Sequence, residues 1–175
     1  MLYHLSEESG IERFEPRATE YASEPVVWAI DAARLHNYLV PRECPRVTYY
    51  GGPDTTASDV TRFLGSSRAV VAVESGWFER LRSCRLYCYH LAPETFERFD
   101  ECAGYFVSRA PVVPAGVEVF EDAIAELLKR EIEVRVVPSL WPLHDAVVAS
   151  SLRFSLIRMR NALPRTTTDS SRFSR

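Results

Sequence analysis

The feature that most constrains the fold is a series of short apolar runs separated by irregular polar segments. Residues 26–30 are almost continuously apolar, which predicts a buried strand. Residues 85–91 alternate instead, so that Leu86 and Cys88 face one side of a strand while Tyr87 and Tyr89 face the other. Further strands are predicted at residues 2–5, 46–50, 69–73, 105–107 and 132–137, and residues 112–114 are predicted to be extended at a sheet edge.

Two longer helices are predicted near the C-terminus. Residues 120–130 are amphipathic, with Ile124, Leu127 and Leu128 on one side. A second helix is predicted to begin at Pro142 and to continue through residue 160, because apolar residues recur at helical spacing. Short helices or helical turns are predicted at 31–39, 58–64, 76–81 and 93–99. Helices and strands do not alternate regularly, so the pattern indicates an α+β protein with small antiparallel or mixed sheets.

The length of 175 residues is most simply that of one domain. We therefore expect a single α+β domain over residues 1–163. Pro164 limits the last helix, and the polar residues after it predict a flexible C-terminal tail over 164–175. The polar segment 6–24 is predicted to be a loop anchored by Ile11 and Phe14.

Composition excludes several classes of protein. The net charge of −3 argues against general nucleic-acid binding. No apolar run approaches the length of about 18 residues that a membrane span needs, so no membrane partner is predicted. No basic stretch followed by an apolar one marks a secretory signal. Four cysteines in a chain of this length do not form a disulfide scaffold, so we interpret them as reduced and the protein as cytoplasmic.

Common catalytic motifs are absent from the sequence. It contains neither a phosphate loop, a dinucleotide fingerprint nor a nucleophile elbow. Cys84 and Cys88 lie four residues apart with His90 nearby, whereas zinc sites usually supply about four ligands on turns. This spacing favours small apolar residues on a buried face, and no metal site is predicted.

His4 is the most suggestive histidine, because Ser6, Glu7 and Glu8 follow at once. On a strand, His4 and Ser6 share a face. A histidine that bonds a ribose hydroxyl, with a serine beside it, is a sensible nucleotide contact. The alternative is that His4 bonds a backbone carbonyl at the end of the strand, since its two ring nitrogens serve both purposes.

Four other residues are candidates for a site. Tyr38 can stack on a base or a nicotinamide ring, or it can pack a short helix against the sheet. Trp141 lies between two prolines and either lines a pocket or fills the core. Glu74 ends an apolar strand, and Glu118 points away from its valine neighbours. Each glutamate is either a catalytic acid or a solvated side chain.

Several stretches resemble a family of bacterial proteins of unknown function. Residues 2–8 read Leu-Tyr-His-Leu-Ser-Glu-Glu, residues 27–31 read Val-Trp-Ala-Ile-Asp, and residues 138–143 read Pro-Ser-Leu-Trp-Pro-Leu. Residues 37–47 and 152–161 add to the resemblance, which covers nearly the whole chain to Asn161. That family implies no catalytic residue.

The order Tyr3-His4-Leu5-Ser6, then a second strand, then Tyr38, also resembles the ADP-ribosyltransferase-like fold. The resemblance implies that His4 contacts the adenosine-side ribose of NAD and that Tyr38 stacks on nicotinamide. A glutamate on a later strand completes the site in that fold. Glu118 is the better match and Glu74 a weaker one, so the third element has no unambiguous counterpart here.

Three functions follow from these residues. The first is an NAD-dependent transferase, in which a glutamate stabilises the charge that develops as nicotinamide leaves. The second is a non-catalytic module in which Arg17, Arg42 and Arg109 bind an anionic small ligand. The third is an interaction protein whose basic last helix and tail meet an acidic partner. The sequence indicates neither a particular substrate nor an oligomeric state.

Overall fold

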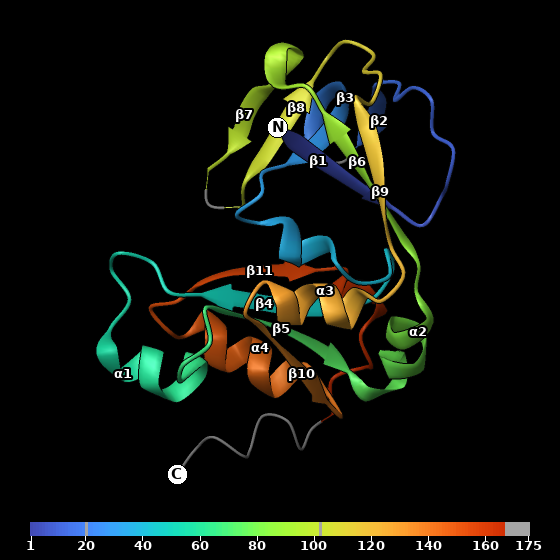
Figure 1. Cartoon of the computed structure of the whole chain (residues 1–175). Helices are drawn as coiled ribbons and strands as arrows, with labels where there is room; N and C mark the ends of the chain where they lie inside the picture. Colours follow the sequence, from blue (N-terminus) through green and yellow to red (C-terminus); the bar gives the residue numbers. More distant parts are fainter. Residues whose placement is uncertain (20, 102, 167–175) are drawn as a thin grey trace. The chain divides into compact units, whose positions relative to one another are not determined.

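A computed structural model describes residues 1–19, 21–101 and 103–166. The chain forms two compact units, each built from two stretches (Figure 1). Unit 1 comprises Met1–Arg42 and Ser83–Ala123, and unit 2 comprises Glu43–Arg82 and Ile124–Arg175. The expectation of a single domain over 1–163 stays a prediction. Of the predicted tail 164–175, residues 167–175 lie outside the described residues, as does Cys102.

Unit 1 contains an antiparallel sheet with the strand order β7-β8-β3-β1-β6-β9, and β2 pairs with β3 beside this path. Strand β1 therefore lies between β3 and β6. The elements of unit 1 are β1 (Leu2–Ser6), β2 (Arg17–Thr19), β3 (Ala22–Ile30), the 3-10 helix η1 (Leu35–Tyr38), β6 (Leu86–Leu91), η4 (Pro93–Thr95), β7 (Glu97–Asp100), β8 (Tyr105–Ser108) and β9 (Gly116–Phe120).

The core of unit 1 lies on one face of this sheet. Buried residues from β1, β3 and β6 form it, and Ile11 and Phe14 pack against it from the segment after β1. Phe14 also pairs its backbone with Val112. The buried residues of this cluster are Leu2, Val27, Ala29, Tyr89, Leu91 and Val112.

Unit 2 contains a mixed sheet with the order β10-β5-β4-β11. Strands β5 and β10 are parallel, and the other two pairs are antiparallel. The elements are β4 (Arg46–Tyr50), α1 (Ala57–Asp59), the π-helix η2 (Val60–Leu64), β5 (Ala69–Glu74), η3 (Ser75–Trp77), α2 (Phe78–Ser83), α3 (Ala123–Lys129), β10 (Ile132–Val137), α4 (Trp141–Val148), β11 (Arg153–Ile157) and η5 (Met159–Asn161).

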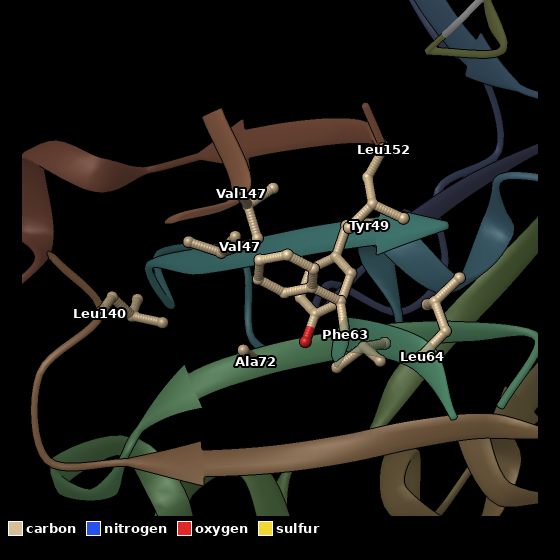
Figure 2. Close-up of a cluster of buried hydrophobic side chains, with 9 residues drawn as sticks. Val47, Tyr49, Phe63, Leu64, Ala72, Leu140, Val147 and Leu152 are labelled. Carbon is tan, nitrogen blue, oxygen red and sulfur yellow. The ribbon is translucent and has the colours of Figure 1, made fainter. Parts of the chain in front are cut away.

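Tyr49 lies in the centre of the unit 2 core (Figure 2). It is 0% exposed and packs among apolar side chains that include Phe63, Ala72 and Val147. Its hydroxyl has no hydrogen-bond partner among the described residues. Burial raises the pKa of Tyr49 to about 12, so the phenol stays protonated at neutral pH. The hydroxyl is therefore a buried polar group without the usual compensation.

The predicted α+β class is confirmed, with one antiparallel sheet, one mixed sheet and short helices. The prediction of a long last helix from Pro142 through residue 160 is wrong. Helix α4 ends at Val148, and residues 153–157 form β11, which pairs with β4. Leu152 and Leu156 lie four apart, a spacing that fits both a helix and one face of a strand. Beyond the end of α4, the hydroxyl and the N–H of Ser151 both bond the carboxylate of Asp59.

Three smaller predictions also need correction. The segment 6–24 is not all loop, since β2 and the start of β3 lie within it. The helical turn predicted at 93–99 stops at Thr95, and β7 follows. The helix predicted at 120–130 is shorter, because Phe120 is the last residue of β9.

Two tyrosines give a matched test of buried hydroxyl groups. Tyr49→Phe removes an unpartnered hydroxyl, so we expect the free energy of unfolding to rise by about 1 kcal/mol. Tyr89→Phe removes a hydroxyl that donates to the Glu8 carbonyl and accepts from the Ile11 N–H, so we expect a fall of about 1 kcal/mol. Urea denaturation of both variants measures these changes. A loss of stability in Tyr49→Phe would contradict the interpretation.

Candidate functional site

His4 is held in the middle of the unit 1 sheet. Its Nδ1 lies 2.9 Å from the carbonyl oxygen of Trp28. A carbonyl can only accept, so Nδ1 carries the proton, and Nε2 of the neutral ring is left as an acceptor. The ring packs against Phe14 with 4.7 Å between centroids. The alternative in which His4 bonds a backbone carbonyl is thus confirmed, and this bond sets which ring nitrogen accepts a further hydrogen bond.

Burial lowers the pKa of His4 below its ordinary value of 6.5. The bond to the Trp28 carbonyl opposes this shift, while the positive charges of Arg42 and Arg17 add to it. The imidazole is therefore neutral at pH 7. The two arginines lie within electrostatic range of His4, although they are far apart in the sequence.

Two hydrogen bonds lie at the end of β1, one made by Ser6 and one made by Glu7. Ser6 is buried and lies on the same face as His4, and its hydroxyl accepts from the Glu8 N–H at 3.0 Å. The carboxylate of Glu7 accepts from the Arg42 N–H at 2.8 Å. This contact holds the residue 42 backbone beside the end of β1.

Of the three arginines predicted to bind an anionic ligand, two lie within electrostatic range of His4. Arg17 is exposed on β2, next to β3, and Arg42 is exposed at the end of the first stretch of unit 1. Arg109 is elsewhere, because its guanidinium pairs with Glu24 on β3 at 2.6 Å and with Glu97 on β7. Arg109 therefore joins two strands, and its charge is matched by two carboxylates.

The structure does not bring Tyr38 to His4. The Tyr38 hydroxyl bonds the hydroxyl of Tyr105. Tyr105 is aligned with Ile30, and Ile30 with Tyr3, so these three side chains point to one face of the sheet. His4 follows Tyr3 directly and points to the other face. The joint contact of His4 and Tyr38 with one NAD molecule, which the resemblance implies, is therefore not supported by the register.

Glu118 also lies across the sheet from His4. It sits on the edge strand β9 in register with Cys88, which is aligned with Leu5. Its carboxylate is 4.0 Å from Nε2 of His90, whose side chain is half-buried on the same face. Glu118 and His90 are thus neighbours, but they do not complete a group with His4.

Glu74 and Trp141 meet in unit 2. Glu74 is 2% exposed and accepts hydrogen bonds from the backbone N–H groups of Leu140 and Leu163. The indole Nε1 of Trp141 donates to the carbonyl of Leu163 at 2.6 Å. The side chains of Glu74 and Trp141 therefore both bind the backbone of Leu163. A buried carboxylate beside the first turn of α4 is also favoured by the helix dipole.

Two further residues that contact Trp141 or its helix, Asp145 and Arg165, are not predicted as site residues from the sequence. The guanidinium of Arg165 donates to both oxygens of Asp145, at 2.7 and 2.8 Å. Its carbon lies 4.2 Å from the centroid of the Trp141 ring. The prediction of a flexible tail over 164–175 does not include this contact, because Arg165 and Asp145 are twenty residues apart in the sequence. Arg165 and then His144 lower the pKa of Asp145 to about 2.

No helix among the described residues is long and apolar enough to cross a membrane. The cysteines at 44, 84 and 88 are buried.

The two units define an α+β protein, with His4 in the sheet of one unit and the side chains of Glu74, Trp141 and Asp145 in the other. The chain belongs to the Family of unknown function (DUF6886), whose model matches residues 3–162. The resemblance to a family of unknown function is thereby confirmed. No curated protein and no solved structure matches the chain, so the resemblance to ADP-ribosyltransferases gains no support from these comparisons.

The lowered pKa of His4 predicts a pH dependence of stability. The unfolded chain binds a proton at His4 near pH 6.5, whereas the folded chain does so only at lower pH. Stability is therefore greatest above pH 6.5 and falls as the pH is lowered through 6.5 toward the folded pKa. His4→Gln removes this contribution and leaves the other histidines in place.

The free energy of unfolding of both proteins, measured in urea at pH 7.5 and pH 5.5, provides the check. We expect wild type to lose more stability than His4→Gln between these pH values. Equal losses would show that the imidazole titrates in the folded chain as it does in the unfolded one.

Proposed function

We propose that the protein is a binding module for an anionic small ligand that also carries hydroxyl groups, with NAD or a related nucleotide as the candidate class. The residues assigned to this role are His4, Ser6, Arg17 and Arg42. The observation that carries the proposal is the placement of a neutral histidine, with a defined tautomer, within range of two arginines.

The tautomer of His4 decides which ligand group it suits. Nδ1 is used by the Trp28 carbonyl, so Nε2 accepts a hydrogen bond and does not donate one at neutral pH. A ribose hydroxyl supplies such a donor, whereas a phosphate oxygen does not. His4 therefore suits the sugar of a nucleotide, as the resemblance implied for this position.

Arg17 and Arg42 suit the anionic part of the same ligand. A guanidinium donates two parallel hydrogen bonds to a phosphate or carboxylate, and these charge-assisted bonds are among the stronger ones in proteins. Both side chains are exposed, and both charges act on His4. Because the imidazole is neutral at pH 7, the two guanidinium groups supply the positive charge that an anionic ligand would need.

Binding without transfer is favoured over the transferase hypothesis. Transfer from NAD would require an acidic group and the stacking tyrosine beside His4. Glu118 and the partner of Tyr38 lie on the opposite face of the sheet, and Glu74 serves unit 2 as an acceptor for two backbone N–H groups. These placements favour the non-catalytic alternative.

The acidic-partner hypothesis has less support. It relied on arginines of a last helix, and that helix is replaced by β11 and η5. Arg158 and Arg160 approach Glu43 at 3.5 and 3.9 Å, and Arg165 pairs with Asp145. Carboxylates of unit 2 therefore already accompany these three positive charges.

Calorimetric titration with ADP-ribose and NAD tests the proposal. We expect Arg17→Gln and Arg42→Gln each to weaken binding about tenfold or more, because each removes a charged hydrogen-bond donor worth about 1.5–3 kcal/mol. Arg109→Gln is the matched control and should bind as wild type does, since that guanidinium is engaged by Glu24 and Glu97. Nicotinamide should not be released from NAD.

Two results would contradict this account. If none of the nucleotides, nor inorganic pyrophosphate, produced heat of binding, the site would have no anionic ligand of this class. If Arg109→Gln weakened binding as much as Arg42→Gln, the ligand would lie elsewhere in unit 1.

A further inference from the structure

The side chains of Glu74, Trp141 and Asp145 form a cluster in unit 2, which we call the arginine site. Glu74 ends β5, and Trp141 and Asp145 lie on α4. The side chain of Glu74 is buried, whereas the carboxylate of Asp145 is about half exposed. The chain's own residues 163–165 occupy the site.

The contacts made to residues 163–165 are those with which a protein recognises an extended peptide. Glu74 accepts from the Leu163 N–H at 3.0 Å, and the Trp141 indole donates to the Leu163 carbonyl at 2.6 Å. Both polar groups of one peptide residue are thus satisfied by side chains. Two residues later, Arg165 places its guanidinium against the Trp141 ring and donates twice to Asp145.

The site is organised by groups other than its occupant. Glu74 also accepts from the Leu140 N–H, and Asp145 also bonds Nδ1 of His144 at 2.8 Å. The backbone N–H of Trp141 donates to the Ser139 hydroxyl, and the Trp141 ring packs edge to face with His144. These contacts orient the three side chains without any contribution from residues 163–165.

The residues that occupy the site, 163–165, are exposed. Leu163 is 55% exposed, so its apolar side chain is not a core residue. The family match covers residues 3–162, which include Glu74, Trp141 and Asp145 but neither Leu163 nor Arg165. The site therefore belongs to the part of the chain that the family shares, and the residues that fill it lie beyond that part.

We propose that the arginine site docks an arginine-bearing extended segment of another protein, and that residues 163–165 occupy it as an internal competitor. The chemistry selects arginine over lysine. A planar guanidinium can stack on an indole ring and at the same time donate two parallel bonds to a carboxylate, whereas an ammonium ion has neither the plane nor the fork. This inference does not depend on the function proposed for unit 1.

The full-length chain with Arg165→Ala provides the test, because this exposed substitution leaves the Glu74 and Trp141 contacts to Leu163 in place. The probe is N-acetylarginine amide, and its lysine counterpart is the control ligand. The signal of the Trp141 indole N–H in a ¹H–¹⁵N spectrum reports binding, and Trp141→Phe assigns that signal.

We expect the arginine probe to shift the Trp141 signal saturably in Arg165→Ala, with at least tenfold weaker binding to wild type, where Arg165 competes. The lysine probe should bind at least tenfold more weakly than the arginine probe. The double variant Arg165→Ala, Asp145→Asn should lose the preference. The proposal is overturned if the arginine probe gives no saturable shift, or if arginine and lysine probes act equally on Arg165→Ala.

The pKa of the Asp145 carboxyl, measured by titration of the same variants, provides a second test of docking. Its pKa of about 2 is held down chiefly by Arg165, so Arg165→Ala should raise it toward the ordinary value of 3.8. Adding the arginine probe should lower it again, and the lysine probe should do so less. An Asp145 pKa that is unmoved by the arginine probe would refute docking at this carboxylate.

Discussion

Side chains alternate between the two faces of the unit 1 sheet, and this constraint decides which of its functional groups can act together. Strand β1 lies between β3 and β6, so the direction of each of its side chains is fixed by two neighbours. Tyr3 points to the face that carries Tyr105, whereas His4 points to the face that carries Tyr89. A single residue therefore separates the aromatic face, where Tyr38 bonds, from the face that carries His4.

Three buried polar groups show how differently such groups are compensated. His4 satisfies Nδ1 with the Trp28 carbonyl and stays neutral, which leaves one acceptor for a ligand. Glu74 is almost completely buried and is compensated by backbone N–H donors from two segments. Tyr49 has no such partner among the described residues. His4 and Glu74 hold their polar atoms in positions that a bonding partner can use. The unpartnered hydroxyl of Tyr49 instead lowers the stability of the unit 2 core.

The sequence predicted much of the fold but less of the sites. Residues 46–50 and 132–137 were predicted with their observed bounds, because β-branched and apolar residues are bounded there by turn residues. The same reasoning failed at Leu152 and Leu156, whose spacing of four fits two periodicities. His4 and Ser6 were predicted on one face by alternation. The position of Tyr38 was not predictable in this way, because its partner Tyr105 is 67 residues distant. Asp145 and Arg165 were missed for the same reason.

In the folded chain His4 is neutral at pH 7, with its proton on Nδ1 and its Nε2 available as an acceptor. Long-range ¹H–¹⁵N correlation spectra of the histidine rings measure this tautomer directly. We expect a protonated Nδ1 and an unprotonated Nε2 for His4 at pH 7. A proton on Nε2 alone, or an imidazolium at that pH, would contradict it.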